Sequence, residues 1–448
     1  MNLHGYWILE ARDWSASATV ALLDRYRPAG ALVYLPVYRA FGFDPVALNV
    51  SIALLQALNV ILFFRLSLRW VGTATAFLAA GIFAFHGGMA ELRYSGGTVY
   101  DTLAVLFVLA GATLFLRCAD SGVGWVYWAA YAMVVWAGIL SKEHFAAFPA
   151  ILVAVMFFEG RPATGRMWAA IGLAAAAILL AAAYRYVHGD PMLKLSSYAL
   201  RFDPELVREN LRAYWYWTRM GSTTIGVAMV ALLCASAAWC VARGRAAMFL
   251  GCSIWVAASM LPLLVIPPRS GFVLYLAWIG ASMAMAMGLE WLRGRPAAAI
   301  VVALVLLWRW HAACIDREPI FPQSYQRDHR LNRNFAAALP SLPPHSADHP
   351  LLLVTDCWLA DQWEPWFIAR LALRTADFHM DRARRPDQAP RPWADYAAVL
   401  NFDGERVTRY FINDWNRTQP SVNLTLRLGK HATSAPGEAG VVGSCPSP

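Results

Sequence analysis

The stretch 27–143 decides the fold, because it contains four long apolar runs separated by short charged segments. The first two runs read VALNVSIALLQALNVILFF (46–64) and VGTATAFLAAGIFAF (71–85), and the next two begin at Tyr100 and Trp125. Runs of this length suit helices that cross a membrane, which need about 20 predominantly apolar residues. The stretch therefore predicts a helical protein that crosses the membrane several times.

The charges between these runs fall into two groups that alternate along the chain. The acids and one lysine occur at run ends that alternation places on one face of the membrane: Glu91, Asp101, Lys142 and Glu143. The arginines that stop the runs belong to the other face: Arg65, Arg69 and Arg117. Arginine-rich short loops mark the cytoplasmic side of most membrane proteins. We therefore expect the acids to gather at the extracytoplasmic face.

The composition of the whole chain agrees with a membrane protein. Of its 448 residues 58% are hydrophobic and only 15% are charged, and the mean hydropathy is +0.43. Soluble domains carry about 25% charged residues. The formal net charge of +9 comes mostly from arginines in short loops, so it indicates topology and not nucleic-acid binding. We expect the bilayer and phosphate-bearing lipids as partners, and no nucleic acid.

Ten segments of roughly 16–22 residues are predicted to span the membrane. They are 46–64, 71–86, 99–116, 124–140, 143–158, 167–186, 222–242, 247–265, 271–291 and 297–313. Ten spans with arginine loops in the cytoplasm place both chain ends outside. Because an outside N-terminus without a preceding span is awkward to insert, we expect a further first helix upstream of Met1.

The predicted fold class is an all-α polytopic membrane protein with a small C-terminal α/β extracytoplasmic domain. Residues 1–45 form a first extracytoplasmic loop with an amphipathic helix at 31–41, and 46–313 form the transmembrane domain. Residues 314–432 form the α/β domain, and 433–448, rich in Gly, Ser and Pro, form a disordered tail.

Three patterns locate structure outside the spans. Residues 351–356 and 397–403 read as strands, and Trp363–Arg374 reads as a helix. The segment 187–221 contains the aromatic cluster 214–217 and is typical of a short interfacial helix.

The seven cysteines show no metal-binding spacing. Cys234, Cys240 and Cys252 lie in apolar runs and are interpreted as packing residues. In an extracytoplasmic tail, Cys357 and Cys445 can pair with each other or with Cys314, and no spacing rule chooses between these pairings.

Several polar residues have both a chemical and a structural interpretation. Asp13 in the first loop can act as a general base on an acceptor hydroxyl, but the residues alone favour an ordinary loop acid, and Glu10 and Asp24 are rival candidates. Asp101 begins an apolar run, so it either caps that helix or faces a functional cavity.

The outside cations also allow two interpretations. Glu91 and Arg93 either pair with each other or line a cavity. Lys142 and Arg269 are expected on the extracytoplasmic side, against the positive-inside bias. A cation beside the hydrocarbon suits a lipid phosphate.

Ordered motifs over residues 10–160 give the chain a family resemblance. They are Tyr26-Arg27-Pro28, Phe41-Gly42-Phe43-Asp44-Pro45, Asn49…Leu54…Ala57-Leu58-Asn59, Phe85-His86…Glu91, Asp101-Thr102-Leu103 and Leu140-Ser141-Lys142-Glu143, with a weaker echo from Arg269 to Tyr275. The set resembles the GT-C superfamily of polytopic glycosyltransferases, which includes protein O-mannosyltransferases and lipid A aminoarabinose transferases. The chain departs from the family pattern at Arg12-Asp13, where a pair of acids is usual, and at Gln56 and Gly87.

The resemblance implies inverting transfer of a sugar from a polyprenyl-phosphate carrier to a glycan, lipid or protein acceptor on the extracytoplasmic face. It implies an enzyme with Asp13 as its catalytic acid, and the Ala-rich spans and simple loops of the composition indicate a bacterial inner membrane. The implied cavity residues are Glu91, Arg93, Asp101, Lys142 and Glu143, and those near the carrier phosphate are Arg269 and Tyr275. Some members use a divalent metal and others do not, so the metal stays open.

A second class of function stays open beside the enzyme. The chain can be a transporter of lipid-linked glycans, or an inactive scaffold with the GT-C fold. Transporters commonly show internal repeats or matched broken helices, and the sequence has no convincing repeat. The gathering of acids at one face favours the enzyme.

The sequence shows no P-loop, GxSxG, HExxH or Rossmann glycine pattern, so soluble nucleotide chemistry is not supported.

Overall fold

The computed structural model describes two sets of residues. The first set is 27–41, 45–86, 96–120, 124–160, 162–187, 200–267, 271–290 and 295–315. The second is the strand segments 352–356, 380–383, 398–402, 407–411 and 425–427. They belong to two compact units, one helical and one containing the strands, and each is described by itself.

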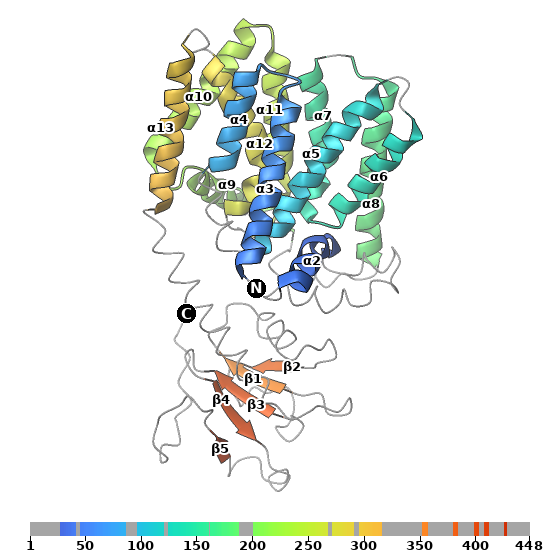
Figure 1. Cartoon of the computed structure of the whole chain (residues 1–448), viewed down its shortest axis with the longest axis vertical. Helices are drawn as coiled ribbons and strands as arrows, with labels where there is room; N and C mark the ends of the chain where they lie inside the picture. Colours follow the sequence, from blue (N-terminus) through green and yellow to red (C-terminus); the bar gives the residue numbers. More distant parts are fainter. Residues whose placement is uncertain are drawn as a thin grey trace. The chain divides into compact units, whose positions relative to one another are not determined.

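Helices make up the described part of the first unit (Figure 1). They are α2 (Ala31–Phe41), α3 (Pro45–Ser67), α4 (Thr73–Phe85), α5 (Val99–Ala119), α6 (Trp125–Ile139), α7 (Phe148–Glu159), α8 (Gly165–Val187), α9 (Pro204–Thr218), α10 (Thr223–Ala242), α11 (Ala246–Leu264), α12 (Ala277–Leu289) and α13 (Pro296–Ile315). Short 3-10 turns lie at η2 (Pro28–Gly30), η4 (Gly96–Thr98), η5 (Glu143–Ala147) and η8 (Gly271–Tyr275). A helix lies in every segment that was predicted to span, and α2 and α9 lie in the two segments predicted to be amphipathic or interfacial.

Six of the described helices are long and apolar enough to cross a membrane. They are α3, α5, α8, α10, α11 and α13. Shorter apolar helices are α4, α6 and α12. The protein is therefore a helical, multi-pass membrane protein.

Two of the predicted span starts are wrong. Residues 143–147 and 271–275 form the turns η5 and η8, so α7 begins at Phe148 and α12 at Ala277. Pro149 in the first turn of α7 explains the first case, because proline is tolerated at a helix start and not inside. The turns η5 and η8 leave Glu143 and Tyr275 outside the regular helices.

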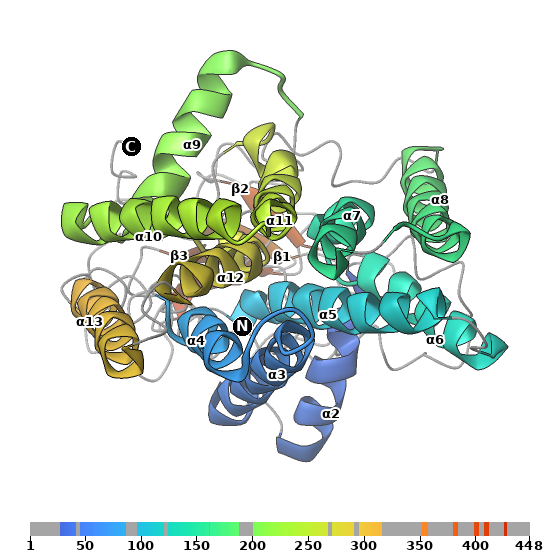
Figure 2. The same cartoon turned by 90° about the horizontal axis from the view of Figure 1, so that it is seen from above.

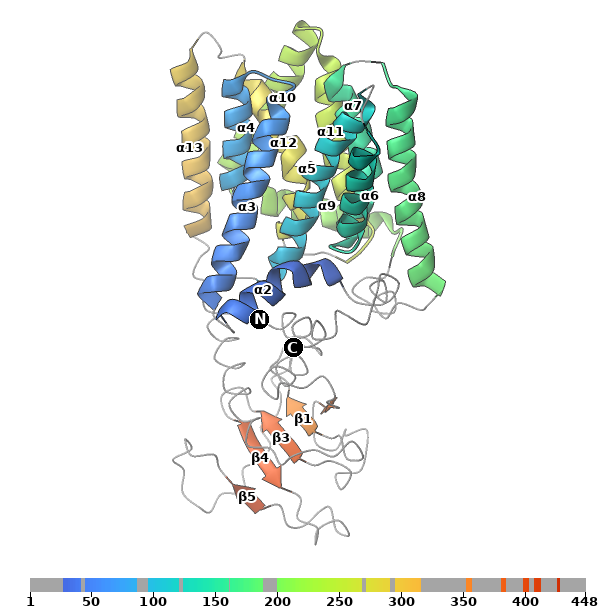
Figure 3. The same cartoon turned by 45° about the vertical axis from the view of Figure 1, so that its right-hand side comes forward.

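The helices α3 to α8 and α10 to α13 run side by side, and those that follow one another in the chain run in opposite directions (Figures 1 and 3). The helix α2 lies across the end of this bundle at which α3 and α5 begin. We call this end, which carries η2, the first turn of α5 and the turn 140–147, the site end. The arginines Arg65, Arg69 and Arg117 belong to the opposite ends of α3 and α5, or to the turn that follows α3.

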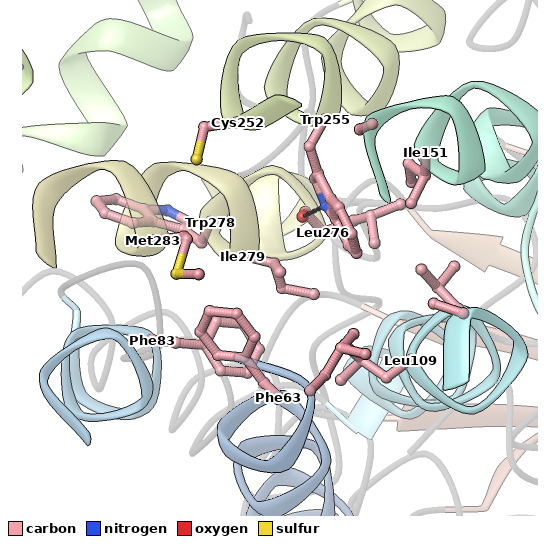
Figure 4. Packing of buried hydrophobic residues seen from close by; sticks show 14 of the residues in the cluster. Phe63, Phe83, Leu109, Ile151, Cys252, Trp255, Leu276, Trp278, Ile279 and Met283 are labelled. Carbon is pink, nitrogen blue, oxygen red and sulfur yellow. Dashed lines mark hydrogen bonds between the residues drawn. The ribbon is translucent and has the colours of Figure 1, made fainter. Parts of the chain in front are cut away.

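The centre of the core lies where α3, α4, α5, α7, α11 and α12 meet (Figures 2 and 4). It contains Phe63, Phe83, Leu109, Ile151, Trp255 and Ile279, from α3, α4, α5, α7, α11 and α12. The indole Nε1 of Trp255 donates to the Leu276 carbonyl oxygen at 3.1 Å, which satisfies the one polar atom of that ring inside the core. In the most apolar 18-residue stretch of α5, 67% of the residues are buried, whereas the corresponding share is 22% in α3, α8 and α13. Among the six long apolar helices, α5 is therefore the one that protein contacts surround most completely.

Glycines bring α12 close to its neighbours. A Cβ built at Gly280 would lie 2.9 Å from the Cys252 carbonyl oxygen of α11. At Gly288 it would approach the Leu232 carbonyl oxygen of α10 more closely still. Close approach at small residues is a common way to pack helices in membranes.

The second unit contains a five-stranded sheet with the order β2-β1-β3-β4-β5. The strands are β1 (Leu352–Asp356), β2 (Met380–Ala383), β3 (Ala398–Phe402), β4 (Val407–Phe411) and β5 (Thr425–Arg427). The strand β1 pairs in parallel with β2 and β3, and the pairs β3–β4 and β4–β5 are antiparallel. Both predicted strands are confirmed, as β1 and β3. The predicted helix 363–374, Cys357 and Cys445 lie outside the described residues.

Candidate functional site

Four of the predicted site residues lie in the described part of the chain: Asp101, Lys142, Glu143 and Tyr275. The other four lie outside it: Asp13, Glu91, Arg93 and Arg269. Their positions and roles stay predictions.

Asp101 and Lys142 form a buried ion pair at the site end. Asp101 lies in the first turn of α5 and Lys142 directly before η5. The Lys142 Nζ lies 2.5 Å from each carboxylate oxygen of Asp101. The side chains are 10% and 6% exposed for Lys142 and Asp101. Thr98 occupies the N-cap position of α5, so the carboxylate of Asp101 faces Lys142 across the fold instead of capping its own helix.

Glu143 forms a second pair, with Arg27. The Arg27 Nε and Nη2 donate to the two Glu143 carboxylate oxygens at 3.1 and 2.7 Å. Arg27 is 7% exposed and Glu143 39%. Burial alone raises the pKa of Glu143, but the charge and hydrogen bonds of Arg27 and the charge of Lys142 outweigh it and leave that pKa at about 2. Glu143 is therefore a carboxylate at any physiological pH.

His144 completes the cluster from the turn η5. Its Nδ1 lies 3.6 Å from an Asp101 carboxylate oxygen. Burial lowers the pKa of His144, although the hydrogen bond that its imidazole donates to Asp101 acts in the opposite direction. The imidazole is therefore neutral near pH 7. Within this cluster the carboxylates of Asp101 and Glu143 are balanced by the cations of Lys142 and Arg27.

Tyr275 lies in a buried polar network beside this cluster. The Asn59 amide donates to the Tyr275 hydroxyl at 3.1 Å and to the Thr102 carbonyl oxygen at 2.9 Å. The Tyr275 hydroxyl donates to the Gln56 amide oxygen. The ring of Phe83 stacks on Tyr275 at a centroid distance of 5.0 Å. The network joins α3 and η8 to the first turn of α5, one residue beyond Asp101.

Sequence reasoning gave no site role to Arg27, Gln56 and Asn59. The two amides carried a usable signal, because polar residues inside an apolar span tend to face the protein interior. The sequence gave less indication of a site role for Arg27, because its contact with Glu143 joins residues 116 positions apart.

The described residues do not provide a metal site. No group of three or more His, Cys, Asp or Glu side chains within them is arranged to hold an ion. The carboxylates of Asp101 and Glu143 each face a cation.

Comparisons with known proteins identify the fold. No protein-family model matches the chain, and no curated protein matches it in sequence. The crystal structure of ArnT from Cupriavidus metallidurans bound to undecaprenyl phosphate matches with a TM-score of 0.51 and 12% identity, over 85% of this chain and 80% of ArnT. An apo structure of the same ArnT gives a TM-score of 0.50 and 13% identity, over 84% and 80%.

A second kind of protein has the same architecture. The Archaeoglobus fulgidus oligosaccharyltransferase in complex with Zn and sulfate matches with a TM-score of 0.50 and 12% identity, over 87% of this chain and 59% of its own. ArnT and this oligosaccharyltransferase are membrane glycosyltransferases with the GT-C architecture. The chain therefore has a GT-C fold, and the predicted resemblance to that superfamily is confirmed.

Proposed function

We propose that the protein is a membrane glycosyltransferase that moves a sugar from a polyprenyl-phosphate carrier to an extracytoplasmic glycan, lipid or protein. The observation that carries the proposal is a cluster of two ion pairs, the buried pair Asp101–Lys142 and the pair of buried Arg27 with Glu143, at one end of a GT-C-fold bundle. Ionisable groups at the end of a membrane span are costly and tend to mark functional sites. Undecaprenyl phosphate bound to ArnT supports a carrier of the same class.

The proposed reaction is an inverting displacement. The acceptor hydroxyl oxygen attacks the anomeric carbon of the sugar, and the bond from that carbon to the carrier phosphate oxygen breaks. Asp13 takes the hydroxyl proton as general base, and the carrier phosphate leaves with the bonding electrons. Fixed charges that meet the developing charge commonly supply the largest part of such catalysis.

Other residues have supporting roles in this proposal. Glu91, Arg93, Asp101, Lys142 and Glu143 line the sugar-binding cavity. Arg269 and Tyr275 approach the carrier phosphate. In this role the Arg269 guanidinium gives the leaving phosphate a positive charge, and the Tyr275 hydroxyl gives it a hydrogen-bond donor.

The proposal includes a topology for the whole chain. The shorter apolar helices α4, α6, α7 and α12 join the six long ones to give ten spans. The site end and the C-terminal domain face the extracytoplasmic side of a bacterial inner membrane, with the arginine loops in the cytoplasm.

Deletion of the gene, followed by mass spectrometry of surface glycans and lipid-linked sugars, tests the proposal. We expect the deletion to remove a sugar and the wild-type gene to restore it, while Asp13→Asn and Asp101→Asn do not. The matched control is Asp120→Asn, because Asp120 follows the opposite end of α5, the helix whose first turn contains Asp101. Full restoration by both site variants would refute an enzymatic role for these acids, as expected for a transporter or a scaffold.

A further inference from the structure

Arg27 has an unusual backbone conformation. Its φ is 50°, in the left-handed region that residues with a side chain rarely adopt. The residue after it is Pro28, which further narrows the backbone choices of Arg27. Such a conformation persists only where surrounding contacts hold it, and it is frequent at functional sites.

The contacts that hold Arg27 come from two elements far away in the sequence. Its guanidinium makes two hydrogen bonds to Glu143 in the turn 140–147. The same guanidinium lies 5.3 Å from the ring centroid of Tyr100 in the first turn of α5, within the range of a cation–π contact. The side chain is almost completely buried.

The residues that follow Arg27 strengthen the same attachment. The Ala29 amide donates to the Leu140 carbonyl oxygen at 3.1 Å. Gly30 packs on the Tyr100 ring, where a Cβ would collide with the ring edge. Tyr34 of α2 meets the Tyr100 ring edge-to-face at 5.9 Å. The segment 27–34 is thus attached to the start of α5 and to the turn 140–147 together.

These contacts hold the backbone before and after Lys142. Leu140 is held by Ala29, and Glu143 is held by Arg27, so the backbone around Lys142 is fixed at two points. Lys142 itself is extended, with φ −160° and ψ 151°, and its Nζ reaches Asp101 from this position. Loss of the contact at Glu143 would leave the turn held on one side.

We propose that Arg27 is a positioning residue, which clamps the segment 27–41 onto the turn 140–147 and thereby sets the Asp101–Lys142 pair. The two-point contact requires arginine, since a guanidinium can bind both oxygens of a carboxylate and an ammonium acts as a single point charge. Only the consequence for sugar transfer rests on the proposed function.

Amine labelling of the full-length protein in its native membrane tests the clamp directly. The chain has three lysines, Lys142, Lys194 and Lys430, so labelling of Lys142 can be measured by mass spectrometry against the other two. In Arg27→Gln we expect labelling of Lys142 to rise on the order of tenfold, as expected for the loss of a charge-assisted hydrogen bond that holds the turn. Hydrogen exchange of the backbone amides of α2 is expected to accelerate by a similar factor.

Arg69→Gln is the matched control. Arg69 binds Glu159 through Nε and Nη2 at 2.7 and 3.1 Å, the same two-point geometry at the opposite end of the bundle. The clamp predicts no change in Lys142 labelling or α2 exchange in this variant. Arg27→Lys is expected to give values between those of wild type and Arg27→Gln.

The same variants separate the clamp from the enzymatic proposal. Unchanged Lys142 labelling and α2 exchange in Arg27→Gln would overturn the clamp, whatever happens to the glycans. If gene deletion changes no glycan, the proposed function fails, while labelling and exchange still decide the clamp. If deletion removes a sugar, the clamp predicts that Arg27→Gln restores it poorly at wild-type protein levels, with partial rescue by Arg27→Lys.

Discussion

The contact between α12 and α10 predicts the effect of a single added methyl group. In Gly288→Ala the new Cβ would lie less than 3.0 Å from the Leu232 carbonyl oxygen and 3.3 Å from the Ser236 backbone nitrogen. Both neighbours are helical backbone atoms, which cannot rotate away as a flexible side chain would. The two helices must therefore separate, with loss of packing along their contact.

The expected cost follows from two opposing effects. Overpacking of a tightly packed core costs about 1–3 kcal/mol. The alanine recovers up to about 1 kcal/mol through its higher helix propensity. With that recovery in full, the net loss in unfolding free energy is therefore about 0–2 kcal/mol. Gly280→Ala, with 2.9 Å to the Cys252 carbonyl oxygen, is expected to lose less.

The stability of these variants is measured by denaturing each purified protein and monitoring the fraction that remains folded. Gly172→Ala in α8 is the control, because a Cβ there has no neighbour within 4 Å, and it is expected to be neutral or slightly stabilising. The expected order of stability is Gly172→Ala, then Gly280→Ala, then Gly288→Ala. If Gly288→Ala is as stable as Gly172→Ala, the helices do not approach as closely as described.

Three further predictions concern the polar groups of the bundle. Lys142→Met leaves the Asp101 carboxylate buried without its cation, so the unfolding free energy measured by denaturation should fall by about 3–5 kcal/mol. Adding Asp101→Asn in the double variant should restore most of this loss. If the losses of the two single variants simply add in the double variant, the two residues are not coupled and the prediction is refuted. The pKa of Glu143 is about 2 in the fold and 4.5 ordinarily, so its stabilising effect is complete above 4.5 and disappears as the pH falls toward 2. The difference in melting temperature between wild type and Glu143→Gln should therefore narrow from pH 7 to pH 3, and a constant difference would contradict the assignment. Asn210→Ala removes three hydrogen bonds from α9 to carbonyl oxygens near the end of α11, at Leu263, Leu264 and Ile266. Hydrogen exchange in α9 should accelerate, and the unfolding free energy should fall by about 2 kcal/mol. Unchanged exchange would show that these hydrogen bonds do not hold α9 in place.

Most of the helical architecture follows from the sequence because an apolar run long enough to cross a membrane has few alternatives to a helix. The run 46–64 became α3, and the aromatic segment around 214–217 became part of α9. The errors lie at helix starts. Residues 143–147 have no strong helix breaker among them, so hydropathy extended α7 backwards through a 3-10 turn.

The chemistry of the site was only partly predictable. Asp101, Lys142 and Glu143 were selected because charges at run ends are costly, and the structure brings all three together. Their partners depend on the three-dimensional packing: Asp101 faces Lys142 across 41 positions, and Glu143 faces Arg27 across 116. A single sequence gives no measure of such distances. Asp13, Glu91, Arg93 and Arg269 stay predictions.

The unequal burial of the helices has a consequence for how the sequence can drift. A position that faces lipid on α13 needs only an apolar side chain, so many replacements there preserve the fold. A position on α5 must also fit the shapes of neighbours on several sides, so a replacement there requires compensating changes elsewhere. Substitutions are therefore expected to accumulate first on the outer helices, whereas α5 changes slowly and in concert with its neighbours. Such uneven drift allows one architecture to persist when few residues are still shared.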